Sequence, residues 1–281
     1  RELRKVIPSF LERVDREDRG VVWSEYLQET REDTADVVAA LFPEGSIVDP
    51  SPTVRLVDFD PEGEVKMIAS MMYPHSTMSE DQLERRVAGM NHEDRMAVAR
   101  AYVGDRRNRR HKPGRALERP FYRFDVLVDY GAFRDLQRHR MLSMDWQNLS
   151  PHHGYISSPL VNAAGMGPVY EEAMERSAAL YDLLVDDFPD QASYAINLAY
   201  KIRFNMNINA RSAMHLIELR TTPQGHPSYR EVGQEMHRLI AEEAGHTVIS
   251  EMMKFVDHTD ETDLERLQSE RRAQEKRQST K

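Results

Sequence analysis

The stretch that decides the fold is FYRFDVLVDYGAFRDLQRHR, residues 121–140. Its first part, Phe121 to Val128, alternates apolar and polar side chains, which is typical of a β-strand with one buried face. Gly131 ends this strand, and Ala132 to Arg140 predicts a short helix. The helix ends in Arg138-His139-Arg140, two permanently charged forks that can hold phosphate or carboxylate bidentately. A basic triplet at a helix end also complements the helix dipole, so a purely structural role stays open.

The residues before this stretch predict a strand and two helices. Thr53 to Phe59 alternates in the manner of a strand, and Glu62 to Met72 has helical spacing. A further helix is expected from Ser79 to Tyr102. It opens on Ser79-Glu80-Asp81-Gln82, the pattern of a capping box in which serine and glutamine satisfy each other's exposed amides.

The residues after this stretch predict a long loop followed by helices. Polar and turn residues fill Met144 to Gly167, and a loop of this length in a compact domain is usually functional. Helices are expected at Pro168 to Val185, Gln191 to Lys201, Ala210 to Leu219 and Ser228 to Phe255.

The ends of the chain differ from its middle. Residues 1–50 predict a helical N-terminal extension or a linker from a preceding domain, with amphipathic helices at Glu2 to Val14 and Val22 to Leu41. Proline and turn formers between Pro43 and Pro52 predict a domain boundary, which leaves residues 51–257 as the main domain. Residues 258–281 are a charged tail, expected to be a solvated helix or disordered. Because the first residue is Arg1, we expect the chain to be a piece of a longer polypeptide or a processed product.

Composition excludes several classes of protein. With 281 residues, 40% hydrophobic and 30% charged, the chain can bury one sizeable core. It has no cysteine, which excludes thiolate metal sites, iron-sulfur clusters and cysteine nucleophiles and allows a cytoplasmic location. No charge-free stretch approaches the roughly 18 to 20 residues that a membrane span needs. The net charge of −9 argues against nucleic acid as a partner. Local basic clusters, Arg106 to Lys112 and Arg138 to Arg140, nevertheless suggest a small anionic ligand.

A second candidate set lies in NARSAMHLIELR, residues 209–220. Asn209 can cap the expected helix, and Arg211 then falls in the first turn, a poor place for a cation unless it meets an anion. His215 follows Arg211 by four residues and so shares its face. A surface face with chance charges is the alternative.

Motifs of other enzyme classes are incomplete or absent in this chain. Glu243 and His246 have the spacing used in di-iron bundles, but there is no second copy, so a solvated helix face is expected and no metal. The side chains of the adjacent His152 and His153 diverge. The chain has no G-x-S-x-G, P-loop or G-x-G-x-x-G motif, which leaves serine hydrolases, P-loop kinases and Rossmann oxidoreductases without support.

Together the two sets resemble the flavin-dependent thymidylate synthases. The resemblance rests on Arg138-His139-Arg140 followed by Ser143, and on Asn209-x-Arg211 with Arg220 eleven positions after Asn209, and it spans roughly Val54 to Phe255. It implies an α+β fold of that family, here with a helical N-terminal extension. It also implies FAD, methylenetetrahydrofolate and NADPH as cofactors, and deoxyuridine monophosphate as the substrate. Family members are homotetramers whose sites combine three chains, so we expect a homo-oligomer, either a tetramer or a tandem-domain dimer.

The resemblance also assigns roles to individual residues. It implies flavin binding by His111, Arg138, His139, Arg140, Asn209, Arg211 and His215, with Glu118 as a nearby acidic residue. It implies nucleotide binding by Arg220, Ser143, Asn148 and Ser150, of which Ser150 and Arg220 are the expected catalytic residues.

The sequence departs from the family on the nucleotide side. Asn148 stands where the family has a serine, and Asp145 and Trp146 replace the Asn and Glu of the same loop. A shifted alignment lets Ser150 serve as the serine, His152 or His153 replace the following arginine, and Tyr155 match the family tyrosine. Another family arginine falls near Ser193, with only Arg203 close by.

These departures leave two alternatives open. One is a paralogue that binds flavin or nucleotide, has lost or changed its reaction, and supports an intact partner domain. The other is a helical module that binds nucleic acid or protein through Arg106 to Lys112, against which the acidic balance counts.

Overall fold

The computed structural model describes residues 1–12, 14–42, 52–259 and 265–279. The chain divides into two compact units, residues 1–50 and 51–281. In the first unit, α1 (Glu2–Val6), α2 (Pro8–Leu11) and α3 (Val21–Leu41) have no buried residue. The single helix predicted over residues 2–14 is wrong, because Ile7 precedes a proline and leaves the helical region of backbone space. Apart from Pro52, the predicted breaker segment lies outside the described residues.

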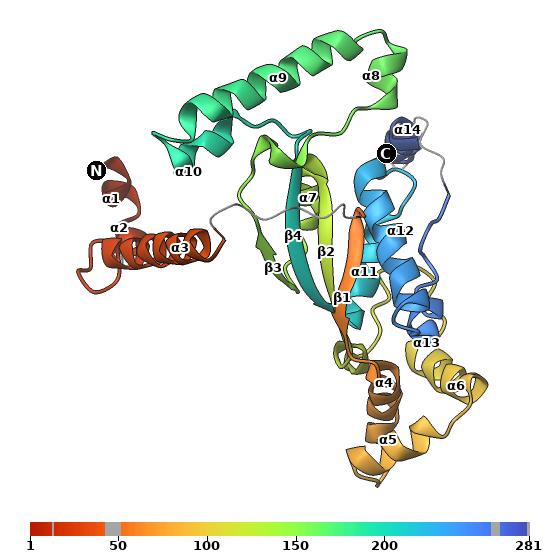
Figure 1. The fold of residues 1–281 in the computed structure, drawn as a ribbon. Helices are drawn as coiled ribbons and strands as arrows, with labels where there is room; N and C mark the ends of the chain where they lie inside the picture. The colour runs from red at the N-terminus through yellow and green to blue at the C-terminus, as the bar shows by residue number, and fades with distance from the viewer. Residues whose placement is uncertain (13, 43–51, 260–264, 280–281) are drawn as a thin grey trace. The chain divides into compact units, whose positions relative to one another are not determined.

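A four-stranded antiparallel sheet forms the centre of the second unit (Figure 1). Its order is β1 (Val54–Phe59), β2 (Phe121–Asp129), β4 (Lys201–Asn209) and β3 (Ser143–Trp146). Every second residue of β2 and β4 is buried, from Tyr122 to Val128 and from Ile202 to Ile208. These side chains join one core with residues of α7 (Tyr130–Leu136), α11 (Ala210–Arg220) and α12 (Pro227–Glu242). The predicted α+β class is therefore confirmed.

The strand β4 was missed by the sequence analysis. Residues 191–201 were predicted to be a helix, but α10 (Pro189–Ala192) and a 3-10 turn (Ser193–Ala195) end before it and β4 starts at Lys201. The run KIRFNMNIN alternates polar and apolar residues throughout, which is the period of a strand. β4 lies between β2 and β3, so it holds the sheet together.

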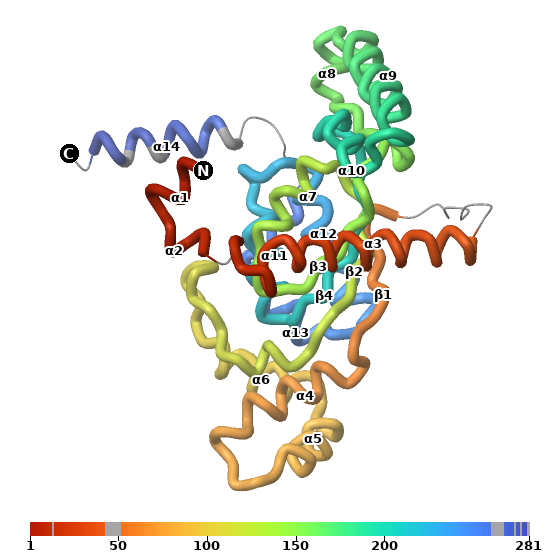
Figure 2. Tube along the Cα trace, turned by 90° about the vertical axis from the view of Figure 1, so that its left-hand side faces the viewer, coloured from red at the N-terminus to blue at the C-terminus, as the bar shows by residue number. Residues whose placement is uncertain are grey.

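Helical segments lie beyond both ends of the sheet (Figures 1 and 2). At one end, α4 (Gly63–Met72) is followed by α5 (Glu80–Ala88) and α6 (His92–Val103). The capping box is confirmed, since the amides of Ser79 and Gln82 each donate to the other's side chain, at 3.0 and 3.4 Å. The single helix predicted from Ser79 to Tyr102 is wrong, because Asn91 caps a new helix by accepting from the Asp94 amide at 2.8 Å.

At the other end, the region predicted as a loop over residues 144–167 contains ordered elements. Besides β3 it holds a 3-10 turn (Pro151–His153) and α8 (Pro159–Ala163). The next helix, α9 (Gly167–Leu184), was predicted correctly. It packs with α10 and Tyr200 into a second, smaller apolar cluster.

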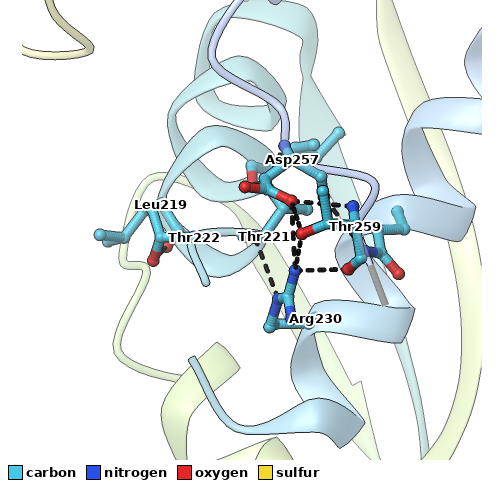
Figure 3. A network of polar contacts seen from close by, with 8 residues as sticks. Leu219, Thr221, Thr222, Arg230, Asp257 and Thr259 are labelled. Carbon is cyan, nitrogen blue, oxygen red and sulfur yellow. Dashed lines mark hydrogen bonds and ion pairs between the residues drawn. The ribbon is translucent and has the colours of Figure 1, made fainter. Parts of the chain in front are cut away.

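The C-terminal helix predicted over residues 228–255 is divided in two. The chain leaves α12 through Gly245, whose φ of +70° favours glycine, and continues in α13 (Thr247–Glu251). Arg230 of α12 then fixes the following segment by donating to the Thr221 carbonyl at 3.1 Å, Asp257 at 3.3 Å and the Thr259 carbonyl at 2.7 Å (Figure 3). The tail contains α14 (Glu265–Ser279), in agreement with the solvated-helix alternative. No helix in the described part of the chain is long and apolar enough to cross a membrane.

Candidate functional site

A cavity of about 330 Å³ lies where three segments of the second unit meet. The segments are the loop before the 3-10 turn η2 (Arg115–Glu118), the residues after α7, and the junction of β4 with α11. Six residues proposed from the sequence line it together: Arg138, His139, Arg140, Arg211, His215 and Arg220. Because α7 ends at Leu136 rather than at Arg140, the Arg-His-Arg triplet follows the helix instead of ending it.

The β4–α11 junction sets the position of the downstream set. Asn209 caps α11 as predicted, with its side-chain oxygen accepting from the Ser212 amide at 2.9 Å. The cap places Arg211 in the first helical turn and His215 one turn later, both facing the cavity. Asn209 itself is not a lining residue of this cavity.

Arg211 meets an anion that belongs to the protein. Its guanidinium donates to Glu118 Oε1 and to the carbonyl of Pro113, each at 3.0 Å. Arg115 and Arg211 together lower the pKa of Glu118. The anion expected beside Arg211 is therefore present within the chain, as the Glu118 carboxylate, and the assignment of Arg211 to the flavin stays a prediction.

Arg220 is hydrogen-bonded to the triplet and to Asp135, which precedes it. Its Nε donates to His139 Nε2 at 3.0 Å, and its terminal nitrogens donate to the carboxylate and the carbonyl of Asp135. Since His139 Nε2 accepts a hydrogen bond, the neutral imidazole carries its proton on Nδ1. Burial, with the Arg220 charge as the second cause, lowers the pKa of His139 to about 4. His139 is therefore neutral at pH 7.

His215 lies beside His139 with its ring edge-on, the two centroids 5.6 Å apart. Burial, followed by the charges of Lys112 and Arg109, lowers the pKa of His215. The cavity therefore contains two neutral imidazoles among permanent cations.

The charge of the lining is strongly positive. Seven lining residues are arginine or lysine, and no Asp or Glu of the described chain is among them. Ion pairs compensate Arg106, Arg138, Arg211 and Arg220. Three further cations, Arg109, Lys112 and Arg140, have no ion pair with any residue that the structure describes. A cavity of this kind attracts phosphate or carboxylate, while the apolar lining of Met141, Leu142, Ile208, Met214 and Leu219 suits a flat ring.

Four other proposed residues do not line the cavity. Ser143 opens β3 opposite Asn207, and Asn148 is exposed in the loop that follows this strand. Ser150 is buried and caps the next 3-10 turn by accepting from the His152 amide at 3.4 Å. His111 has an exposed side chain, and its carbonyl accepts from Arg106. Arg203, the arginine close to the position where the family has another arginine, also does not line the cavity. It pairs with Asp125 of the neighbouring strand at 2.9 Å.

The sequence analysis noted the basic cluster Arg106 to Lys112 but did not predict that its residues lie in different environments. Arg106, Arg109 and Lys112 all line the cavity, but Arg106 is buried and its two terminal nitrogens donate to Glu218 at 2.7 and 2.6 Å. The cluster is therefore only partly a solvated surface. No periodic signal could have shown this, because the partner of Arg106 lies 112 residues away.

His246 is a further correction. It was expected on a solvated helix face, but it lies between α12 and α13, buried, with Nδ1 2.8 Å from the Tyr122 hydroxyl. Within the described ranges, no group of three or more His, Asp or Glu residues is arranged to hold a metal.

Comparison with known sequences identifies relatives that cover most of this chain. The family model described as thymidylate synthase complementing protein matches residues 55–245. A UPF0159 protein of Chlamydia pneumoniae is 38% identical over 273 residues, covering 96% of this chain and 50% of that protein. A UPF0159 protein of Thermoplasma acidophilum is 33% identical over 221 residues, covering 77% of this chain and 44% of that protein. The chain thus spans about half the length of these curated relatives.

Comparison with solved structures shows the same fold. Thymidylate synthase X from Helicobacter pylori, crystallised with FAD and dUMP, superposes with a TM-score of 0.50 at 17% identity, covering 72% of this chain and 98% of that one. The UMP/dUMP methylase PolB from Streptomyces cacaoi, bound with 5-Br dUMP, gives 0.53 at 18% identity, with 71% and 94% covered.

Proposed function

Because the chain belongs to the thymidylate synthase complementing protein family, we propose that it binds FAD and methylates deoxyuridine monophosphate to thymidylate. Methylenetetrahydrofolate is the proposed carbon donor and NADPH the proposed reductant. The observation that carries the proposal is the convergence of the Arg138-His139-Arg140 triplet with Arg211, His215 and Arg220 around one cavity. At least 71 positions separate the triplet from the downstream set, so only the fold brings the two sets together.

The lining fits a flavin nucleotide by its chemistry. Three arginines would hold phosphate oxygens: Arg138, Arg140 and Arg211. Arg140 has no ion pair in the described chain, whereas Arg138 and Arg211 each form an ion pair with a carboxylate. The apolar residues would contact the ring. When bound, FAD would supply the redox chemistry and the relay of the one-carbon unit to the uracil. The neutral His139 would keep Arg220 oriented through the 3.0 Å hydrogen bond, without adding a charge beside the substrate.

The size of the cavity supports a role for a second chain or domain. A volume of about 330 Å³ is at the low end of the roughly 300–1,000 Å³ found for ligand sites. A dinucleotide bound together with a nucleotide substrate needs a larger cavity than this. We therefore propose that a homo-oligomer or a tandem partner completes the site, with residues 51–257 as the catalytic domain, residues 1–50 as a helical extension and residues 258–281 as a tail.

A second candidate function is a flavin- or nucleotide-binding paralogue without turnover. The observation in its favour is that the expected nucleotide-side residues Ser143, Asn148 and Ser150 are absent from the lining. In addition, each nitrogen of the Arg220 guanidinium already donates a hydrogen bond within the chain.

A direct experiment separates the two candidates. The purified full chain is titrated with FAD and followed by flavin fluorescence, and thymidylate formation is then measured with methylenetetrahydrofolate and NADPH. UMP is tested in parallel with deoxyuridine monophosphate as an alternative substrate. FAD binding with turnover, however slow, supports the synthase. FAD binding with no detectable turnover, even in the associated species, supports the paralogue, and a chain that binds neither FAD nor nucleotide contradicts both.

A further inference from the structure

We propose that residues 105–114 form a fixed anion-binding arm of the cavity, anchored by Arg106 and contacting ligand phosphate through Arg109 and Lys112. This segment is called the arm below. The identity of the ligand, a flavin or nucleotide phosphate, rests on the proposed function, whereas the arm itself is argued from contacts within the chain.

The anchor of the arm is a fully buried ion pair. The side chains of Arg106 and Glu218 are 3% and 0% exposed, and the two terminal nitrogens of Arg106 donate to the two Glu218 oxygens at 2.7 and 2.6 Å. Arg106 Nη1 also lies 3.4 Å from the Met252 carbonyl, and its guanidinium lies 5.1 Å from the centre of the Phe255 ring. The arm is thereby joined to α11 and to the segment after α13.

The same guanidinium also fixes the shape of the arm. Arg106 Nε donates to the His111 carbonyl at 2.8 Å, which closes a short loop on its own anchor. Within this loop, the Asn108 carbonyl accepts from the His111 amide at 3.1 Å and the Asn108 side chain accepts from the Arg110 amide at 2.9 Å. In the loop held in this way, Arg109 and Lys112, three positions apart, line the cavity together with Arg106, while Arg107 and Arg110 do not.

The two presented cations have no counter-charge in the described chain. Arg211 and Arg220 have Glu118 and Asp135, but neither Arg109 nor Lys112 forms an ion pair with a described residue. Their positive field reaches the opposite wall, where they are, after burial, the next causes that lower the pKa of His215. Because the loop backbone that carries these cations is already held, less backbone freedom is lost when a phosphate binds than at a mobile surface loop.

Burial of the ion pair is informative about its role. Removing two charges from water costs free energy, and apolar residues of similar volume often stabilise a protein as well as a buried pair does. What an apolar pair cannot reproduce is the directed fork that holds a carboxylate and the His111 carbonyl at the same time. We therefore assign Arg106 and Glu218 as positioning residues of the arm.

Binding measurements test the ligand contacts. Dissociation constants of the full chain are measured for FMN against riboflavin, and for deoxyuridine monophosphate against deoxyuridine, so that each pair differs only by one phosphate. We expect Arg109→Ala and Lys112→Ala each to weaken at least one phosphate-bearing ligand about 5-fold or more, with riboflavin and deoxyuridine unchanged. Arg107→Ala and Arg110→Ala, in the same arm but off the cavity, are the matched controls and should change none of the four constants. Losses equal to those of the controls, or equal losses for the phosphate-free ligands, overturn the arm.

The test also separates the arm from the proposed function. If the parent chain binds neither FAD nor deoxyuridine monophosphate, the proposed function fails, and pyrophosphate is titrated calorimetrically as the probe. Pyrophosphate binding that is lost in Arg109→Ala and Lys112→Ala supports the arm without the synthase. Absent binding, or binding that persists in both variants, overturns the arm.

The anchor is tested by the double variant Arg106→Met with Glu218→Met, and by Arg106→Lys, which keeps the charge but loses the fork. Folding is checked by circular dichroism, and the folded variant is used. We expect weaker binding of the phosphate-bearing ligand and a flatter dependence of its dissociation constant on NaCl, with riboflavin binding retained. Unchanged affinity and salt dependence in a folded variant overturn the positioning role.

Discussion

His139 shows how a single side chain can serve a cationic cavity without adding to its charge. Its imidazole is half-buried beside Arg220 and His215, and both burial and these neighbours oppose protonation. In the neutral form, Nε2 accepts from Arg220 and so orients the guanidinium that we propose as a contact of the nucleotide. The pair of residues thus combines one fixed charge with one acceptor.

Stability should depend on pH through this residue. The pKa of His139 in the folded chain is about 4, below its ordinary value near 6.5, so the unfolded chain binds more protons between these values. We therefore expect the free energy of unfolding to fall as the pH drops from about 6.5 toward 4. Urea denaturation at several pH values checks this. His139→Gln should flatten the dependence, whereas His75→Gln, at an exposed histidine outside this cavity, should leave it as it is; equal slopes in both variants would contradict the prediction.

Arginine substitutions test the flavin assignment at the same scale. We expect Arg140→Ala and Arg211→Ala each to weaken FAD binding, by about 10-fold or more, because each removes a charge-assisted contact worth roughly 1.5 to 3 kcal/mol. Arg211→Ala should also raise the pKa of Glu118 toward its ordinary value, because it removes one of the two arginines that lower it. Fluorescence titration gives the constants, and Arg176→Ala on α9 is the control. Affinity unchanged in both variants would show that these residues do not hold the flavin.

At the scale of elements, the junction of β4 with α11 places half of the site. β4 is paired on both sides and is fixed in register, so the residue that follows it has a defined position at the end of the sheet. The Asn209 cap begins α11 immediately, and the helix then carries Arg211, His215 and Arg220 to the cavity. A shift of the helix start by one residue would rotate all three side chains by about 100°.

Removing the cap should affect both stability and binding. We expect Asn209→Ala to lower the free energy of unfolding by about 1 kcal/mol, since the Ser212 amide loses its acceptor, and to weaken FAD binding as the first turn frays. Asn91→Ala removes the equivalent cap of α6, which is not part of the cavity, and should lower stability without changing FAD affinity. Urea denaturation and flavin titration of both variants check this. If Asn209→Ala lowers the free energy of unfolding but leaves FAD affinity unchanged, the prediction that the cap supports the site is wrong.

At the scale of the whole molecule, the chain spans about half the length of its curated relatives, and its cavity is small for the ligands proposed. The site that the family resemblance implies draws residues from several chains. Ser143, Asn148 and Ser150 lie off the cavity of their own chain, so in an assembly they could only serve a neighbouring site or none.

Assembly is therefore expected to accompany flavin binding. If a second chain or domain completes the site, a monomer cannot bind the whole dinucleotide tightly. Light scattering coupled to size separation, with FAD absorbance recorded in parallel, should find the flavin in the associated species. A lone monomer that binds FAD tightly would refute this expectation.

Activity in isolation should be low for the same reason. We expect the 281-residue chain alone to convert deoxyuridine monophosphate slowly or not at all. An error of about 1 Å in placing the uracil can cost on the order of a hundredfold in rate. Thymidylate formation is measured with and without Ser150→Ala. Brisk turnover that is insensitive to Ser150→Ala would contradict this prediction, and activity lost only in Ser150→Ala would support the shifted alignment.

The sequence by itself determined the local features of this protein. Alternation in residues 121–128 predicted β2, side-chain type and spacing predicted the Ser79 and Asn209 caps, and two short motifs led to the family. Each of these features depends on residues that lie within about a dozen positions of each other. The tertiary structure decided the rest: the pairing of β3 with β4, the burial of Arg106 against Glu218, and which cations face the cavity. Those outcomes depend on partners far away in the sequence, and a charge pattern does not state which distant carboxylate will neutralise a given arginine.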